Sequence, residues 1–366
     1  MKSIAIFNNN GGVGKTTLTY HAAYALAELG HRTLIIDLDP QSNITLYGLT
    51  EDQLTSIWEA EDAFIEDFEN TVKRTAPAEL AAIAGGNRSI HFLLKATEDG
   101  TGEIGQLATP VSLHANLDLI PGRLTVHTFE ERIASRWSDA YRGEPLALRT
   151  LTKIRRLCTE YAAARGYEFV IVDTSPSLGI MNKVIISTVD GFLVPCMPDL
   201  FSLYGIRNIG RALALWKRDF QTMLGLLSDA KRAEFPQSFV QFLGFTIYKA
   251  KKYTSGNAWD LAAAHFGFAE RIPKTIQDFI PAETYQHLPA NLLPLPIGGT
   301  AVMHDHMTMA ANAQKYKRPI WLVPSAPNLD AEDRTTIIGN RARYEATKTG
   351  YQTFARELLV RMQTLT

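Results

Sequence analysis

A run of small and polar residues near the start of the chain has the types and spacing that bind phosphate. Residues 11–17 read GGVGKTT. The glycines let the backbone turn tightly and bring several N–H groups close to an anion, where a Cβ would obstruct. Lys15 would bridge two phosphates, the Thr16 hydroxyl would bind Mg²⁺, and Thr17 would reach the α-phosphate of a nucleotide. The spacing therefore predicts a phosphate-binding loop.

The segments on both sides of this loop favour the same interpretation. Residues 4–7 are all apolar, which is typical of a strand buried on both faces in a parallel sheet. Residues 18–29 keep helical apolar spacing, and Gly30 ends that helix. The helix would point its positive dipole end at the bound anion. A glycine turn that merely joins strand to helix is the alternative, and the strand–glycine–Lys–Thr–helix order argues against it.

Two further apolar strands end in aspartates. Residues 33–38 lead into Asp39, and residues 169–173 end at Asp173. Ligands bind at the carboxyl ends of strands in open parallel sheets, so both carboxylates are expected near the loop. Asp39 would position water and hold the Mg²⁺ shell, and Asp173 would hold that shell in the manner of a Walker B aspartate. A solvated Asp-Pro turn at residues 39 and 40 is the alternative for Asp39.

Composition restricts the class of protein. The chain has 366 residues, of which 46% are hydrophobic, and a formal net charge of −1. The net charge therefore gives no overall positive field that would indicate nucleic-acid binding. Cys158 and Cys196 lack metal-ligand spacing and are expected to be buried and reduced. No apolar run reaches membrane-spanning length, and the first residues run directly into a strand. We therefore expect a cytoplasmic protein without a signal peptide or a membrane anchor.

Several segments together resemble the ParA/MinD family of P-loop ATPases, with the deviant Walker A loop K-G-G-x-G-K-[ST]. DLDPQSN at residues 37–43 is similar to the switch I of that family, and DTSPSLG at residues 173–179 is similar to its switch II. LIPG at residues 119–122 and QKYKRPIWL at residues 314–322 also resemble family segments, the latter packing near the nucleotide. The likeness is greatest to ParA-like chromosome and plasmid partitioning ATPases.

This resemblance implies a fold and a set of site residues. The fold is α/β, a doubly wound, mostly parallel sheet of the P-loop NTPase type, with ATP and Mg²⁺ as ligands. The residues that would bind ATP are Gly11, Gly12, Val13, Gly14, Lys15, Thr16 and Thr17. The residues that would hold the metal are Thr16, Asp39 and Asp173. Catalysis would rest on Lys15 and on Asp39, which orients the attacking water, with Asn10 at the signature position.

Asn10 departs from the family pattern. The family has a lysine just before the glycine pair, and that lysine contacts the phosphates of the partner's nucleotide across a dimer. Asn10 is shorter and carries no charge. We expect ATP binding through Lys15 to survive and ATP hydrolysis to ADP and phosphate to be impaired.

Three functions follow from the resemblance. The first is a DNA partition switch: a homodimer formed on ATP binding, which binds DNA without sequence preference and is stimulated by a ParB-like or other partner protein on the nucleoid. The second, motivated by Asn10, is an ATP-binding subunit that hardly hydrolyses ATP and clamps a multiprotein complex. The third, a membrane-recruited ATPase of the MinD type, is disfavoured by the polar last turn and interrupted basic face of the C-terminal helix. A metabolic relative is least favoured because no cysteine pair is placed to hold a cluster.

The remaining segments yield expectations about organisation. We expect one P-loop ATPase domain over residues 1–366, with an inserted helical and loop region at about 50–116 and a C-terminal helix at about 330–362. Residues 51–69 predict an amphipathic helix with a solvated acidic face, for which a partner-binding surface is the alternative. Residues 95–106 predict an exposed loop. Residues 146–165 predict a helix with a solvated basic face, for which a DNA-binding stripe is the alternative. That face carries Arg149, Lys153, Arg155, Arg156 and Arg165.

Overall fold

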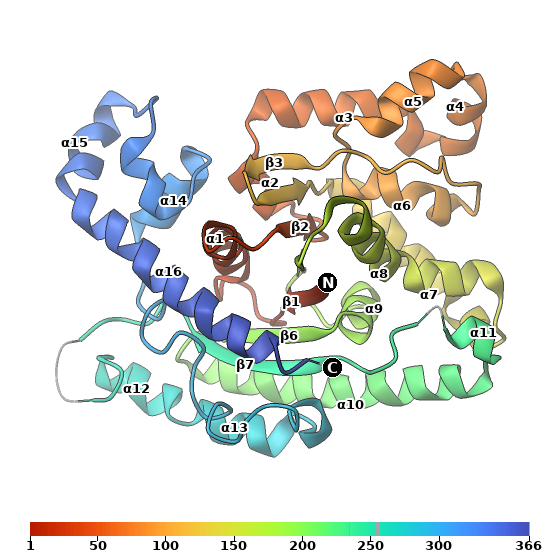
Figure 1. Ribbon diagram of the computed structural model, residues 1–366. Helices are drawn as coiled ribbons and strands as arrows, with labels where there is room; N and C mark the ends of the chain where they lie inside the picture. Colours follow the sequence, from red (N-terminus) through yellow and green to blue (C-terminus); the bar gives the residue numbers. More distant parts are fainter. Residues whose placement is uncertain (234, 254–256, 366) are drawn as a thin grey trace.

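A seven-stranded sheet forms the centre of the computed structural model, which describes residues 1–233, 235–253 and 257–365 (Figure 1). The strand order is β3-β4-β2-β5-β1-β6-β7. The strands are β1 (Lys2–Ile6), β2 (Thr33–Asp37), β3 (Val111–His114), β4 (Leu117–Ile120), β5 (Phe169–Asp173), β6 (Gly191–Cys196) and β7 (Gln241–Ile247). Every neighbouring pair is parallel except β3 with β4. The predicted doubly wound, mostly parallel α/β fold is confirmed.

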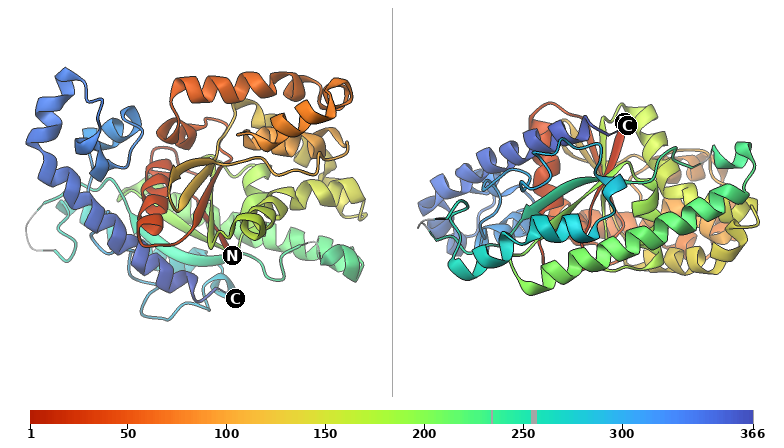
Figure 2. Two further views of the ribbon diagram at one scale, coloured as in Figure 1. Left: turned by 45° about the horizontal axis from the view of Figure 1, so that its top comes forward. Right: turned by 90° about the horizontal axis from the view of Figure 1, so that it is seen from below.

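Successive residues of the central strands face opposite layers of helices, as the two-residue period of a strand requires. Ala5 packs with α7 (His127–Ala140), α8 (Pro145–Arg165), α9 (Ile180–Thr188) and α10 (Leu200–Leu226) in one core cluster. Ile4 and Ile6 pack with α1 (Lys15–Glu28) and α16 (Arg341–Met362) in the other. Figure 2 shows α10 and α16 on opposite sides of the sheet. Helices on both faces explain why the strands are apolar without alternation.

The register brings three strand ends to one place. Ile6 at the end of β1 lies opposite Asp173 at the end of β5, and Asp173 lies opposite Asp37 at the end of β2. The loops that follow these strands therefore start side by side at the carboxyl edge of the sheet.

A group of helices lies between β2 and β3. They are α2 (Asn43–Gly48), α3 (Glu51–Glu66), α4 (Phe68–Arg74), α5 (Pro77–Gly85) and α6 (Ile90–Asp99). Phe64, Phe68 and Phe92 form a small aromatic core of their own there. The acidic face of α3 is not wholly solvated, because Glu61 is fully buried and accepts hydrogen bonds from Ser89 and Arg123.

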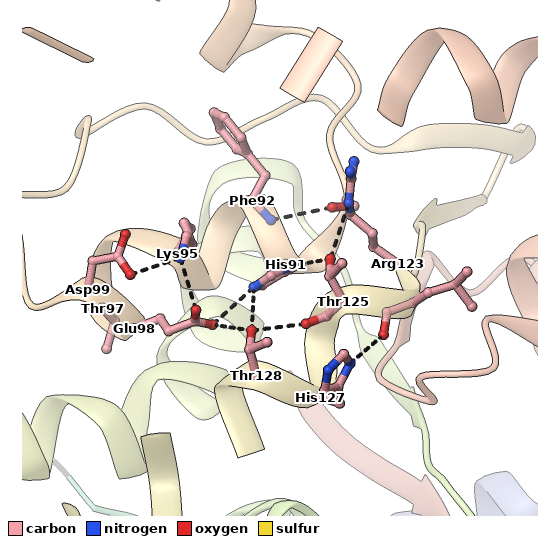
Figure 3. Close-up of polar contacts among 12 residues, drawn as sticks. His91, Phe92, Lys95, Thr97, Glu98, Asp99, Arg123, Thr125, His127 and Thr128 are labelled. Carbon is pink, nitrogen blue, oxygen red and sulfur yellow. Dashed lines mark hydrogen bonds and ion pairs between the residues drawn. The ribbon is translucent and has the colours of Figure 1, made fainter. Parts of the chain in front are cut away.

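The exposed loop predicted for residues 95–106 is wrong over its first part, because α6 continues to Asp99. Figure 3 shows the polar network that holds this helix against the start of α7. His91 contacts the Thr125 hydroxyl at 2.7 Å and Glu98 at 3.0 Å, and Lys95 donates to Glu98 at 3.0 Å. Burial alone would raise the pKa of Glu98, but the hydrogen bonds with His91 and Lys95 outweigh it and lower that pKa to about 2. Charged residues that suggest a solvated loop are thus partners inside the protein.

The basic face of α8 is likewise turned to intramolecular partners. Lys153 is buried and pairs with Glu103 at 3.0 Å, and Arg155 pairs with Asp190 at 2.8 Å. Arg149 donates to the carbonyl oxygen of Thr101. The expected solvated basic face is therefore wrong for these residues, and they are poor candidates for contacts with DNA.

The remaining helices follow β6 and β7. They are α11 (Asp229–Arg232), α12 (Ala263–Ala269), α13 (Ile272–Phe279), α14 (Thr308–Lys315) and α15 (Ala331–Gly339), with 3₁₀ turns at η2 (Ala282–Thr284) and η3 (Ile320–Ser325). A further 3₁₀ turn, η1 (Leu124–Val126), directly precedes α7. The segment expected as one helix at about 330–362 is two helices, α15 and α16, separated at Asn340. The buried side chains of Tyr351, Phe354 and Leu358 pack α16 into the same core cluster as β1.

Two glycines of α10 give a matched test of how closely α10 packs against α13. A Cβ on Gly210 would lie 2.1 Å from the carbonyl oxygen of Phe279 at the end of α13, whereas nothing lies within 4 Å of a Cβ on Gly225. Gly210→Ala should lower the free energy of unfolding by about 1–3 kcal/mol, because backbone must move. Gly225→Ala should raise it by up to about 1 kcal/mol through helix propensity. Urea unfolding measures both, and equal effects of the two changes would contradict the close contact of α10 with α13.

Candidate functional site

The loop between β1 and α1 has a conformation that depends on its glycines. Gly12 and Gly14 have φ of 74° and 85°, in the left-handed region that residues with a Cβ rarely adopt. A Cβ on Gly14 would also lie 2.0 Å from Cδ1 of Tyr248, whose ring packs directly on the loop. Gly14 precedes the first turn of α1, so free N–H groups of the helix start face the same space as the loop.

Lys15 lies under this loop among carboxylates. The lysine is buried, and its Nζ donates a 2.9 Å hydrogen bond to the carbonyl oxygen of Asn10. Burial lowers the pKa of Lys15, while the charges of Asp173 and Asp39 oppose that shift. The Thr16 hydroxyl donates to Asp173 at 3.3 Å. Burial first, and then the charges of Asp37 and Asp39, raise the pKa of Asp173 well above its usual range.

Asp37 at the end of β2 and Asp39 just after it have different surroundings. Asp37 is fully buried and accepts hydrogen bonds from the backbone N–H of Asp39 and from the backbone and hydroxyl of Thr45. Burial raises the pKa of Asp37 to about 7 although these hydrogen bonds oppose it. Asp39 instead lines the pocket in front of the loop. Asp37 therefore holds the segment from Asp39 to Thr45 in place, and Asp39 is the carboxylate available to a ligand.

A pocket of about 250 Å³ lies in front of the loop. Its lining combines residues predicted from sequence with residues that the sequence did not single out as site residues. The predicted ones are Gly11, Gly12, Gly14, Lys15, Thr16, Thr17 and Asp39, and the additional ones are Asn43, Tyr47, Pro176, Lys249 and Gln314. The Val13 side chain is buried in the protein, and Asp173 lies behind Thr16.

Asn10 does not line this pocket. Its Nδ2 donates to the carbonyl oxygen of Phe201 at 2.9 Å, at the start of α10. A Cβ on Gly205 in the same helix would lie 2.9 Å from that Nδ2, so the glycine makes room for the asparagine. The side chain at the signature position is thus tied to α10 within its own chain.

The additional lining residues come from elements far apart in the sequence. Tyr47 is in α2 and contacts the Thr17 hydroxyl at 3.1 Å, Lys249 follows β7, and Gln314 is in α14. From the sequence, the lysines after β7 and the segment 314–322 can be expected near the carboxyl edge of the sheet. Only the fold shows which of their side chains reach the loop.

The donors in this pocket suit a polyphosphate together with a hard cation. Backbone N–H groups and the Lys15 ammonium are anion ligands, and the oxygens of Thr16, Asp39 and Asp173 are of the kind that Mg²⁺ prefers. In residues 1–233, 235–253 and 257–365, no group of three or more His, Cys, Asp or Glu is arranged to hold a metal.

Comparisons with known proteins agree with this geometry. Residues 1–225 match a family model, AAA_31, described as an AAA domain. The chain is 28% identical over 254 residues to an uncharacterized protein of Methanocaldococcus jannaschii, a match that covers 69% of this chain and 74% of that protein. It is also 28% identical over 217 residues to the chromosome partitioning protein ParA of Myxococcus xanthus, a match that covers 59% of each.

A solved structure shares the fold. The structure of pNOB8 ParA bound to nonspecific DNA superposes with a TM-score of 0.54 and 17% identity, over 99% of this chain and 98% of that one. Among the helices of the described residues, none has the length and apolar character needed to cross a membrane.

The buried carboxyl of Asp37 predicts a pH dependence of stability. Its pKa is about 7 in the folded chain against 3.8 for the free group, so its stabilisation is complete below pH 3.8 and lost as the pH rises through 7. Asp37→Asn removes this titration. The stability of the variant relative to the parent should therefore rise between pH 5 and pH 8. Urea unfolding at the two pH values measures it, and a constant difference would contradict the assignment.

Proposed function

The chain belongs to the ParA-like family of P-loop ATPases, and on this basis we propose that it is a Mg²⁺-dependent ATPase that switches between monomer and DNA-associated dimer. The observation that carries the proposal is the pocket in front of Gly11–Thr17, where the loop, Lys15 and Asp39 converge. Partitioning of DNA, or a related DNA-associated process, is the biological role that the family supports.

ATP binding would use the residues of the loop. The N–H groups of residues 11–17 and the ammonium of Lys15 would hold the phosphates, and Thr17 would reach the α-phosphate. Bound Mg²⁺, with Thr16, Asp39 and Asp173 around it, would neutralise phosphate charge. Asp39 would accept a hydrogen bond from the attacking water and hold it in line with the γ-phosphate, giving ADP and phosphate. Positioning and charge are what this reaction requires from the protein.

Dimer formation is supported by the surface beside the pocket. Leu200, Phe201 and Tyr204 at the start of α10 are 47%, 75% and 54% exposed, and Phe201 is the residue whose carbonyl holds Asn10. Large apolar side chains gathered on a surface mark interaction sites in otherwise soluble folds. We propose that a second copy covers this face when ATP is bound.

The cellular setting follows from the same proposal. We propose a cytoplasmic, nucleoid-associated protein that binds DNA without sequence preference, by analogy with pNOB8 ParA, whose structure was solved bound to nonspecific DNA. A ParB-like or other partner protein would stimulate hydrolysis and release the DNA. No membrane attachment is proposed.

A second candidate function is favoured by Asn10. Its side chain is uncharged and tied to Phe201, so it brings no cation to the nucleotide of a partner subunit. The chain would then bind ATP, hydrolyse it very slowly, and hold a multiprotein complex together without a partition cycle.

Lys15 and Asp39 should separate binding from hydrolysis. Lys15→Ala should abolish measurable binding of ATP, because the phosphates lose their buried cation. Asp39→Ala should leave binding within about threefold and reduce turnover at least about 100-fold, because the water loses its acceptor. Calorimetry and phosphate release measure the two effects. Unchanged affinity in Lys15→Ala would refute the site, and unchanged turnover in Asp39→Ala would remove Asp39 from the mechanism.

The proposed ATP-dependent switch is tested by measuring ATP turnover in the parent chain and in its Asn10→Lys variant. Each protein is measured with and without duplex DNA. We expect DNA-stimulated turnover that is faster in the variant, and DNA binding that weakens steeply with salt because its contacts are to phosphates. Equal rates in both proteins would show that the family lysine has no counterpart role at position 10. ATP binding without turnover in either protein, with DNA and partner present, would favour the complex-clamping function.

A further inference from the structure

Two cations line the pocket within the described part of the chain, Lys15 and Lys249. Lys15 is buried, hydrogen-bonded to the carbonyl oxygen of Asn10, and close to the charges of Asp39 and Asp173. Asn10 adds no charge and is turned toward α10. A nucleoside triphosphate in this pocket therefore meets the buried ammonium of Lys15, and Lys249 is the other positive charge in the lining.

The position of Lys249 next to the loop is fixed by Tyr248. The Tyr248 ring is buried against Gly14, the last residue before α1. The hydroxyl of Tyr248 also contacts that of Tyr351 in α16 at 3.3 Å. With Tyr248 anchored at both ends, the following residue is held at the mouth of the phosphate pocket.

Lys249 has an unusual backbone, with φ of 57° in the left-handed region. Its two neighbours are held by backbone hydrogen bonds, Tyr248 N–H to Cys196 and Ala250 N–H to Met303, each 2.9 Å long. A non-glycine residue persists in this conformation where the surroundings fix it, and such residues gather at ligand sites. The conformation of Lys249 is thus fixed by the backbone hydrogen bonds of the residues on either side of it.

The side chain of Lys249 is free for a ligand. Lys249 is exposed, and its ammonium makes no hydrogen bond or ion pair with any residue that the structure describes. A surface lysine without a partner is ordinary, but this one lines the same pocket as Gly11, Gly12 and Asp39. A flexible ammonium in that place suits charged phosphate oxygens, which accept point-charge hydrogen bonds from lysine.

We propose that Lys249 binds the terminal phosphates of the nucleotide from within the same chain. The proposal rests on the proposed function, since it takes the pocket to be the ATP site. It makes Lys249 a specificity-determining residue that favours ATP over ADP.

The test compares nucleotides that differ in their terminal phosphate. Affinities for the β,γ-imido analogue of ATP and for ADP, each with Mg²⁺, are measured by calorimetry in the parent and in Lys249→Gln, which removes the charge and keeps a polar side chain. The analogue should bind about tenfold more weakly to the variant and ADP less than about threefold more weakly, since a charge-assisted contact is lost only where the terminal phosphate is present. Lys249→Arg should retain most of the preference for the analogue.

The matched control is Lys251→Gln. Lys251 is exposed on the same segment but does not line the phosphate pocket, so its variant should bind both nucleotides like the parent. Equal losses for analogue and ADP in Lys249→Gln would place the lysine against the base or ribose and overturn the proposal, as would no loss at all. If the parent itself binds neither nucleotide, the proposed function fails as well, which is a different result.

Discussion

Lys15, Asp39 and Asp173 are ionisable groups kept together at one edge of the sheet, all three on buried side chains, and much of the architecture serves to hold them there. A buried charge is costly unless it is paired, and here the Lys15 ammonium offsets the two carboxylates, whose own charges repel each other. Their proximity follows from strand register, because β1, β2 and β5 end at adjacent positions. A loop of backbone N–H groups then adds the positive potential that suits an anionic ligand.

The pocket in front of the glycine loop is connected to two more distant parts of the molecule. On one side, Asn8 and Asn10 hydrogen-bond to the carbonyls of Pro195 and Phe201, which ties the loop to the exposed apolar start of α10. On the other side, His21 in α1 accepts a hydrogen bond from the N–H of Ile320 and stacks on Tyr351. A ligand on the loop is therefore in contact, through short paths, with the face proposed for the dimer and with the C-terminal helices.

The central strands and the glycine loop could be predicted from the local sequence alone. The strands around residues 4–7, 33–38 and 169–173 and the glycine loop were predictable because an apolar run followed by glycine or aspartate has few other structural solutions. The rest depends on contacts between distant segments. From the sequence, Lys153 is expected in solvent, but the fold pairs it with Glu103. Lys249 is one of several basic residues in the sequence, and only the packing of Tyr248 on Gly14 shows that it lies next to the glycine loop. No proline marks the separation of α15 from α16 at Asn340.

Hydrogen–deuterium exchange, with and without Mg²⁺ and a non-hydrolysable ATP analogue, can decide whether the glycine loop is the phosphate site. We predict slower exchange in peptides that contain residues 10–17, because their N–H groups become hydrogen-bonded to phosphate. We predict no change in the open basic pocket of about 700 Å³ that Arg149, Arg155 and Arg156 help to line. Protection at that second pocket with unchanged exchange at the glycine loop would contradict the assignment of the site.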